Sequence, residues 1–132
     1  MAASFRVEQN AILENAEGRV LLLQKKGKWM LPGGGLELNE TGLEGLRREL
    51  REETGITNFS IERIIDAETS DGKEAYIVTF VCKLQENKDV ALSNEHEAFA
   101  WISMDEIENY EYWHPHIKER LLLFKKHRNS SR

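Results

Sequence analysis

Three glutamates in the first half of the chain are spaced for shared chemistry. Glu49, Glu52 and Glu53 follow the spacing i, i+3, i+4, which brings side chains to one side of a helix. Clustered carboxylates repel one another, and a hard divalent cation such as Mg²⁺ relieves that repulsion because it prefers oxygen ligands. The spacing therefore predicts a metal-binding helix face.

The alternative interpretation is a solvated helix face with ordinary ion pairs. Glutamate is a good helix former, so acid-rich helices are common. Arg48 lies four residues after Glu44 and four before Glu52, which is the spacing of surface ion pairs. Spacing alone leaves both interpretations open.

The helix that must position these acids has clear start and stop signals. Thr41 followed by Glu44 forms a capping box, and Gly55 is typical of a left-handed C-cap. These signals predict a helix over residues 42–54. Its expected apolar stripe consists of Leu43, Leu46 and Leu50.

Two glycines interrupt the same helix on its acidic side. Gly42 and Gly45 each cost about 1 kcal/mol relative to alanine in a helix interior. Because stability alone does not favour them, we expect this strip without side chains to leave room for a ligand above the metal.

A longer pattern runs from Gly34 to Ile56. It has the form G-x5-E-x7-R-E-U-x-E-E-x-G-U, where U is an aliphatic residue, and it resembles the complete box of the Nudix hydrolase family. Every fixed position of the box is filled, by Gly34, Glu40, Arg48, Glu49, Leu50, Glu52, Glu53, Gly55 and Ile56. The preceding Leu31-Pro32-Gly33-Gly34 is similar to the usual lead-in of that family.

The Nudix resemblance implies both a fold and an activity. The implied fold is an α/β/α sandwich with a mixed β-sheet between helices, which agrees with the order of strands and helices expected here. The implied activity is Mg²⁺-dependent hydrolysis of a diphosphate bond in a nucleoside diphosphate derivative, with Mn²⁺ as a substitute metal. Mg²⁺ is needed because the substrate and the helix face that meets it are both anionic.

The resemblance also assigns roles to individual residues. Glu52 and Glu53 would be the principal metal ligands, and Glu49 a further ligand or the base that takes a proton from water. Arg48 would orient the acids. The resemblance also implies that the Gly33 carbonyl binds the metal. Glu40 would lie behind the metal-binding acids and support them.

Many family members add an acid from a distant loop. Ser93-Asn94-Glu95-His96, followed by Trp101, is similar to that context. We therefore expect Glu95 to be the loop ligand, with Glu97 as the second choice. A lone loop histidine is more often an ordinary polar residue, and this interpretation is favoured for His96 over a role in assisting Glu95.

The substrate contacts are less specific. The backbone of Gly34 and Gly35 can approach a ligand closely, and Trp29 is a candidate for stacking on a base, although packing is the alternative. The substrate class stays open among nucleoside triphosphates, dinucleoside polyphosphates and RNA 5′ ends. Family members that act on dinucleoside polyphosphates often have a tyrosine at a set distance after the box. Tyr76 is close to that position here but is not aligned with it.

Two rival functions remain. One is a non-catalytic, nucleotide-sensing Nudix-fold module, although such modules usually lose box acids that are all present here. The other is a Nudix-like isomerase, which would need a catalytic cysteine. Cys82 is the single cysteine and lies in an apolar stretch expected to be a core strand.

Composition narrows the class of protein. The chain has 132 residues, 40% of them hydrophobic, and a formal net charge of −5, which indicates one domain, residues 1–132, without DNA binding. We expect no membrane span, a cytoplasmic location and a homodimer. Residues 125–132 are expected to be a fraying basic tail.

The remaining elements follow from turn and alternation signals. Residues 5–14 and 20–23 are expected to form a hairpin whose second strand is buried on both faces. Residues 61–67 and 75–84 are expected to form another, with a central strand at 76–82. A last helix is expected from Pro115.

Overall fold

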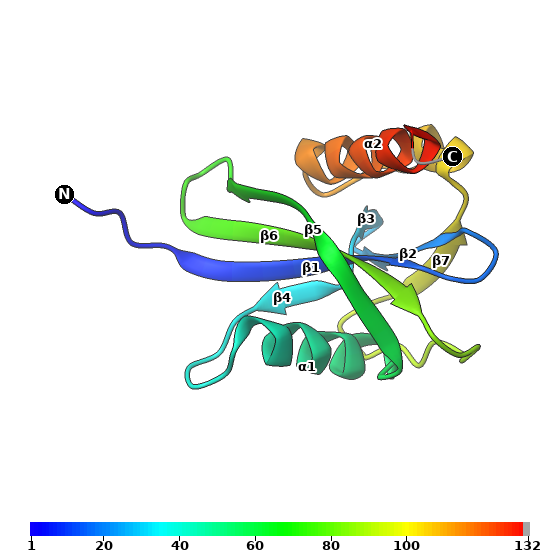
Figure 1. The fold of residues 1–132 in the computed structure, drawn as a ribbon, viewed down its shortest axis with the longest axis horizontal. Helices are drawn as coiled ribbons and strands as arrows, with labels where there is room; N and C mark the ends of the chain where they lie inside the picture. The colour runs from blue at the N-terminus through cyan, green and yellow to red at the C-terminus, as the bar shows by residue number, and fades with distance from the viewer. Residues whose placement is uncertain (131–132) are drawn as a thin grey trace.

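The computed structural model describes residues 1–130, and the chain forms a sandwich in which one sheet lies between two α-helices (Figure 1). The strands are β1 (Arg6–Glu14), β2 (Val20–Lys25), β3 (Lys28–Met30), β4 (Gly33–Gly35), β5 (Phe59–Thr69), β6 (Ala75–Leu84) and β7 (Ala98–Ile102). The helices are α1 (Gly42–Thr54), the 3-10 helix η1 (Met104–Asn109) and α2 (Pro115–Ser130). The predicted α/β sandwich is confirmed.

The sheet is mixed because β1 pairs in parallel with β6, while its other pairings are antiparallel. The strand order is β3-β2-β1-β6-β5, with β4 on β1 and β7 on β2. The predicted hairpin β5–β6 and the central position of β6 are confirmed. The first expected hairpin is formed only at Glu14 and Val20, beyond which β2 pairs with β7 and β3.

Two apolar cores occupy the two faces of the sheet. Successive residues of a strand point to opposite faces, so Ile12 packs toward Leu121 of α2, whereas Leu13 packs toward Leu46 of α1. Residues 20–23 are fully buried, which confirms that β2 is enclosed on both faces. Each helix is therefore held by its own core.

The start and end of α1 agree with the prediction. The Thr41 side chain accepts from the Glu44 amide, and the Glu44 carboxylate accepts from the Thr41 amide at 2.7 Å. Gly55 ends the helix with φ +74°, in the left-handed region that glycine tolerates. Local sequence signals thus fix the helix that carries the acids.

The apolar stripe of α1 is shorter than expected. Leu46 and Leu50 are fully buried, but Leu43 is 52% exposed. Leu43 lies in the first turn, where the neighbouring strand residue is the polar Gln9, which packs against Gly42. The prediction that Leu43 faces the core is wrong, because Gly42 and Gly45, not Leu43, face β1 at the start of the helix.

Helix α2 continues further than expected. Fraying was predicted from residue 125, but the helix extends to Ser130, and the rest of that tail, residues 131–132, lies outside the described residues. Arg128 donates to Glu14 Oε2 at 2.6 Å and to the Gly18 carbonyl at 2.9 Å, which fixes the last turns to the sheet. Among residues 1–130, no helix has the length and apolar content to cross a membrane.

Candidate active site

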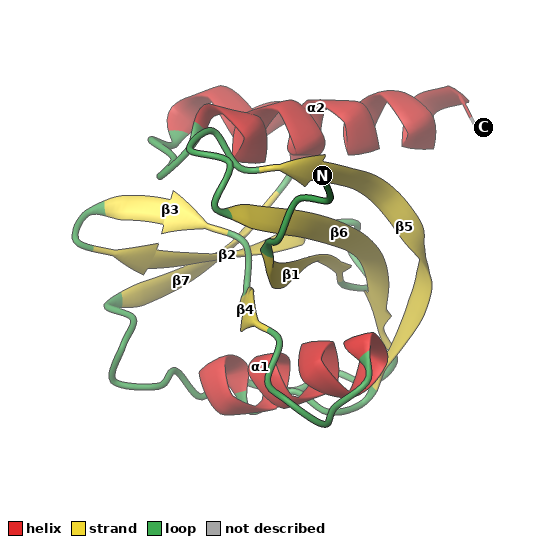
Figure 2. Ribbon diagram, turned by 90° about the vertical axis from the view of Figure 1, so that its left-hand side faces the viewer, coloured by secondary structure: helices red, strands yellow, loops and turns green. Residues whose placement is uncertain are grey.

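The glycine loop before α1, Gly33–Gly35, forms strand β4 and extends the sheet. Strand β4 lies between β1 and α1 (Figure 2). Gly33 stands opposite Asn10, and the Ala11 amide donates to the Pro32 carbonyl at 3.0 Å. Because bonded and non-bonded pairs alternate along an antiparallel ladder, β1 does not use the polar groups of Gly33. The Gly33 amide donates instead to Glu53 Oε1 at 2.7 Å. The Gly33 carbonyl, a predicted metal ligand, is likewise not used by β1.

Glu53 is the most enclosed acid of α1, with 7% of its surface exposed. While Oε1 accepts from Gly33, Oε2 lies 2.9 Å from His96 Nε2. Burial raises the pKa of Glu53 to about 7, although the hydrogen bonds from His96 and Gly33 lower it. His96 is itself buried, so its interpretation as an ordinary polar loop residue is wrong.

The loop before β7 brings a second acid to Glu53. In the described part of the chain, Glu53, Glu95 and His96 form a group whose donor atoms all lie within 4.8 Å of one another. Glu97, the second choice for this place, accepts from the Lys26 amide at 2.6 Å instead. The geometry thus favours Glu95 over Glu97 as the loop acid.

Arg48 joins four of the predicted site residues. Its guanidinium donates to both oxygens of Glu40, at 3.0 and 2.9 Å. It also donates to Glu49 at 2.9 Å, to Glu52 at 3.2 Å and to the Gly35 carbonyl at 3.0 Å. The hydrogen bond from Arg48 holds the pKa of Glu40 at about 2. Arg48 is therefore more than an isolated surface ion pair, because it links Glu40 to Glu49 and Glu52.

Glu49 and Glu52 differ in their surroundings. A Cβ added at Gly34 would lie 2.6 Å from the Glu49 carboxyl carbon, so Gly34 lets the loop and this acid come together. Burial raises the pKa of Glu49, against the opposing effect of Arg48. The Glu52 side chain is 53% exposed. The three acids share one side of α1, but Glu53 alone is enclosed.

The two helix glycines do not leave room for a ligand. A Cβ at Gly42 would lie 2.9 Å from Gln9 Nε2, and a Cβ at Gly45 would lie 2.7 Å from a methyl carbon of Leu36 and 2.9 Å from Glu40. The expectation of an open strip is wrong, because neighbouring side chains fill it. The glycines instead allow β1 and the loop to pack closely on α1.

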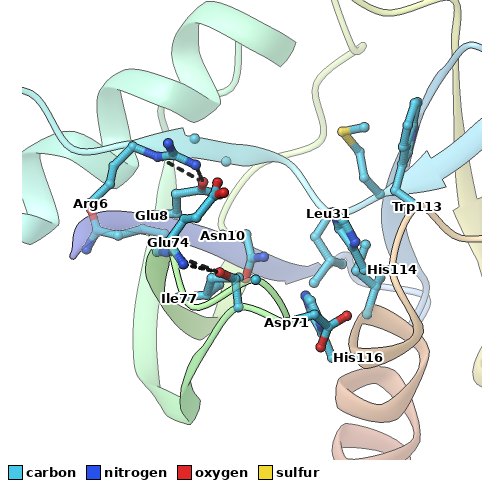
Figure 3. Close-up of a pocket in the computed structure, with 18 of the residues that line it drawn as sticks. Arg6, Glu8, Asn10, Leu31, Asp71, Glu74, Ile77, Trp113, His114 and His116 are labelled. Atoms are coloured by element: carbon cyan, nitrogen blue, oxygen red, sulfur yellow. Dashed lines mark hydrogen bonds and ion pairs between the residues drawn. The ribbon is translucent and has the colours of Figure 1, made fainter. Parts of the chain in front are cut away.

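A cleft of about 530 Å³ opens beside the glycine loop (Figure 3). Gly33 and Gly34 line it, whereas Gly35 and Trp29 are not among its lining residues in the described part of the chain. The Trp29 ring packs edge-on against Tyr110 at 5.2 Å, so the alternative interpretation, packing, describes Trp29.

The rest of the cleft lining comes from residues that the sequence did not single out for substrate. They include Asn10 of β1, the Asp71 turn between β5 and β6, and the start of α2 at His114 and His116. The His114 and His116 rings stack at 5.2 Å.

Comparison with known proteins decides the family. The chain matches the NUDIX domain family over residues 4–123. It belongs to the Nudix family. The Nudix resemblance and the hydrolase class predicted from the box are therefore confirmed.

Individual relatives support this Nudix assignment. Nucleoside triphosphatase NudI of Escherichia coli O17:K52:H18 (strain UMN026 / ExPEC) is 35% identical over 97 residues, covering 64% of this chain and 68% of that protein. RNA pyrophosphohydrolase of Halorhodospira halophila (strain DSM 244 / SL1) is 50% identical over 54 residues, covering 39% of this chain and 30% of that protein. The crystal structure of the MutT protein from Methanosarcina mazei Go1 superimposes with a TM-score of 0.79 at 27% identity, covering 97% and 98% of the two chains.

The two loop acids of this Nudix domain give a matched pair of variants. Glu95→Gln is expected to lower kcat about 10²-fold, because an amide cannot supply the charge that a metal ligand supplies. Glu97→Gln is expected to stay within about threefold of wild type, since the amide oxygen can still accept from the Lys26 amide. Steady-state kinetics with Mg²⁺ measure kcat for both variants. A larger loss of kcat in Glu97→Gln would identify Glu97 as the loop ligand in place of Glu95.

Arg48 gives a second prediction for the Nudix site. Arg48→Lys is expected to lower kcat roughly 10- to 100-fold, because a single ammonium cannot hold Glu40 at two points and also reach the acids. The matched control is Arg51→Lys on the exposed side of the same helix, which is expected to leave kcat unchanged. Equal kinetics for the two variants would show that Arg48 does not orient the acids.

Proposed function

We propose that this Nudix domain is a Mg²⁺-dependent hydrolase that cleaves a diphosphate bond in a nucleoside diphosphate derivative, with nucleoside triphosphates as the first substrates to test. The observation that carries the proposal is the position of Glu53. It is held by the Gly33 amide and His96 and stands next to Glu95, and Gly33 also lines the cleft.

The residues present fit a hard divalent cation. Glu52, Glu53, Glu95 and the Gly33 carbonyl are oxygen donors, which suit Mg²⁺ and allow Mn²⁺ as a substitute. Burial raises the pKa of Glu53, and a cation bound beside it would favour its ionised form. When bound, the cation would polarise phosphoryl oxygens and make a water more nucleophilic.

The protein's own groups position the reaction. Arg48 fixes one oxygen of Glu49 and keeps that acid beside the glycine loop, where it is available as a ligand or as the proton acceptor. His96 and the Gly33 amide fix both oxygens of Glu53. The cleft, which Gly33 and Gly34 line, provides a partly enclosed place for the nucleoside.

The relatives guide the choice of substrate. The E. coli relative is named a nucleoside triphosphatase, and it matches over the larger part of this chain. The H. halophila relative is named an RNA pyrophosphohydrolase, which makes a 5′-triphosphate RNA the second substrate to test. A module that only senses nucleotides is disfavoured because Glu49, Glu52 and Glu53 are all retained.

The test is a panel of nucleoside triphosphates, dinucleoside polyphosphates and 5′-triphosphate RNA, assayed for phosphate and nucleotide release. Release is expected with Mg²⁺ or Mn²⁺, to fall to background with EDTA, and to return when Mg²⁺ is restored. Nucleotide binding without release from any member of the panel would overturn the proposal in favour of a sensing module.

A further inference from the structure

The loop before β7 is docked on the end of α1 by its backbone. The Ser93 amide donates to the Glu53 carbonyl at 3.2 Å, and the His96 amide donates to the Ser93 carbonyl at 3.2 Å, which closes a turn. The turn carries Glu95 and places the His96 ring against the Glu53 carboxylate. His96 is therefore the side chain through which this turn meets the most enclosed acid of α1.

The two nitrogens of the His96 ring have different surroundings. Nε2 lies 2.9 Å from Glu53 Oε2, whereas Nδ1 is enclosed and has no hydrogen-bond partner among residues 1–130. The side chain as a whole is 3% exposed. The ring is thus held through Nε2.

These surroundings indicate where the ring carries its proton. A neutral imidazole has one N–H donor and one acceptor nitrogen. A proton on Nδ1 would be an enclosed donor without an acceptor, and it would leave the lone pair of Nε2 facing an oxygen of the Glu53 carboxylate. A proton on Nε2 instead gives a hydrogen bond to an ionised acceptor, which is the stronger kind. We therefore expect a neutral His96 ring protonated at Nε2.

The position of this proton decides what the ring can do for a cation. The donor atoms of Glu53, Glu95 and His96 lie within 4.8 Å of one another, so the competing role for His96 is that of a nitrogen ligand. A histidine nitrogen binds a metal through its lone pair. Nε2 lacks that lone pair when it is protonated, and Nδ1 is enclosed. The ring therefore donates to a metal-binding acid instead of binding the metal.

We propose that His96 is a positioning residue of the metal site. Its Nε2–H donates to Glu53 Oε2 and orients that carboxylate, its backbone keeps the neighbouring Glu95 beside Glu53, and neither ring nitrogen binds the cation. This inference rests on the proposed function, because it takes Glu53 and Glu95 as metal ligands. It leaves the cation with oxygen ligands, which suit Mg²⁺ and Mn²⁺ better than Zn²⁺.

Nitrogen NMR of the wild type tests the proton position directly. The chain has four histidines, and the ring signals of His96 are those that disappear in His96→Gln. At a pH at which Glu53 is ionised, His96 is expected to show a protonated Nε2 and an unprotonated Nδ1, without metal and with saturating Mg²⁺. A proton on Nδ1, or loss of the Nε2 proton when Mg²⁺ binds, would overturn the inference.

Two amide variants separate the two ring nitrogens. The amide nitrogen of glutamine and Nε2 of histidine are the same number of bonds from Cβ, whereas the amide nitrogen of asparagine corresponds to Nδ1. His96→Gln is therefore expected to keep the affinity for Mn²⁺, measured by calorimetry without nucleotide, within about threefold of wild type. His96→Asn is expected to weaken it roughly 10- to 100-fold, as loss of a hydrogen bond behind a metal ligand typically does.

His114→Asn is the matched control for the histidine-to-asparagine change. His114 is an exposed residue just before α2, so this variant should leave the Mn²⁺ affinity unchanged. Thermal unfolding shows whether each variant is folded, and the NMR of the wild type decides the inference if His96→Asn does not fold. Equal Mn²⁺ affinities for folded His96→Gln and His96→Asn, whether both are retained or both weakened, would overturn the positioning role.

These measurements use no nucleotide, so the inference and the proposed function can fail separately. Mn²⁺ binding that is kept by His96→Gln and lost by His96→Asn, in a protein that hydrolyses no member of the substrate panel, would support the role of His96 and overturn the proposed hydrolysis. Hydrolysis by the wild type, together with equal Mn²⁺ affinities for the two amide variants, would do the reverse.

Discussion

The Glu53→Gln variant is expected to lose about 10³-fold or more in kcat while remaining folded. A metal clamp on a transferring phosphoryl group supplies several kcal/mol of transition-state stabilisation, and about 4 kcal/mol corresponds to 10³-fold. The amide keeps the size of the side chain and can still accept from the Gly33 amide. What it loses is the charge.

The thermal stability of the Glu53→Gln variant distinguishes a loss of charge from a loss of structure. Burial raises the pKa of Glu53, so replacing the carboxyl by a neutral amide should leave the thermal midpoint unchanged or slightly higher. Circular dichroism and thermal unfolding check this expectation. Glu62, an exposed residue of β5, gives the matched control Glu62→Gln for both kinetics and stability. Turnover by Glu53→Gln close to that of Glu62→Gln would contradict the role of Glu53 as a metal ligand.

The fold and the acidic helix were predictable because their signals are local. The capping box at Thr41, the C-cap at Gly55 and the spacing of the box lie within a few turns of chain, and the structure reproduces α1 with the same bounds. Leu43 was misplaced because the spacing of a stripe does not reveal which residues of the first turn face the sheet. Here Gly42 and Gly45 face Gln9 of β1 instead.

The parts of the site that escaped prediction depend on contacts between distant segments. His96 gave no local sign that it would be buried against Glu53, 43 residues earlier in the chain. The helix glycines were noticed, but sequence could not show that Gln9 and Leu36 fill the space beside them. The register partners of Asn10, which are Gly33 and Thr79, likewise depend on how the strands align in the folded sheet.

The substrate side was predictable only in part for the same reason. The close approach of Gly34 followed from glycine itself, and the structure shows why the approach is needed, since Glu49 occupies the place of a side chain. Trp29 was a candidate because aromatic rings stack on bases, but its contact with Tyr110 brings together segments about 80 residues apart. Whether an aromatic ring lines the cleft or packs elsewhere therefore depends on the assembled fold.

The Gly33→Ala variant is expected to lose more than about 3 kcal/mol of unfolding free energy and most of its activity. Gly33 has φ +153°, and an added Cβ would lie 2.1 Å from the Gln9 carbonyl oxygen, a clash with backbone that cannot be relieved by a rotamer change. Relief requires β4 to move away from β1, which would displace the Gly33 amide that holds Glu53.

Gly35→Ala is the matched control for this backbone position. Gly35 belongs to the same strand, has no positive φ, and a Cβ built there meets nothing within 4 Å, so its stability should stay within about 0.5 kcal/mol of wild type. Chemical denaturation measures both variants. If Gly33→Ala were as stable as Gly35→Ala, the pairing of β4 with β1 would not be what positions the amide for Glu53, and the acid would have to be fixed by His96 alone.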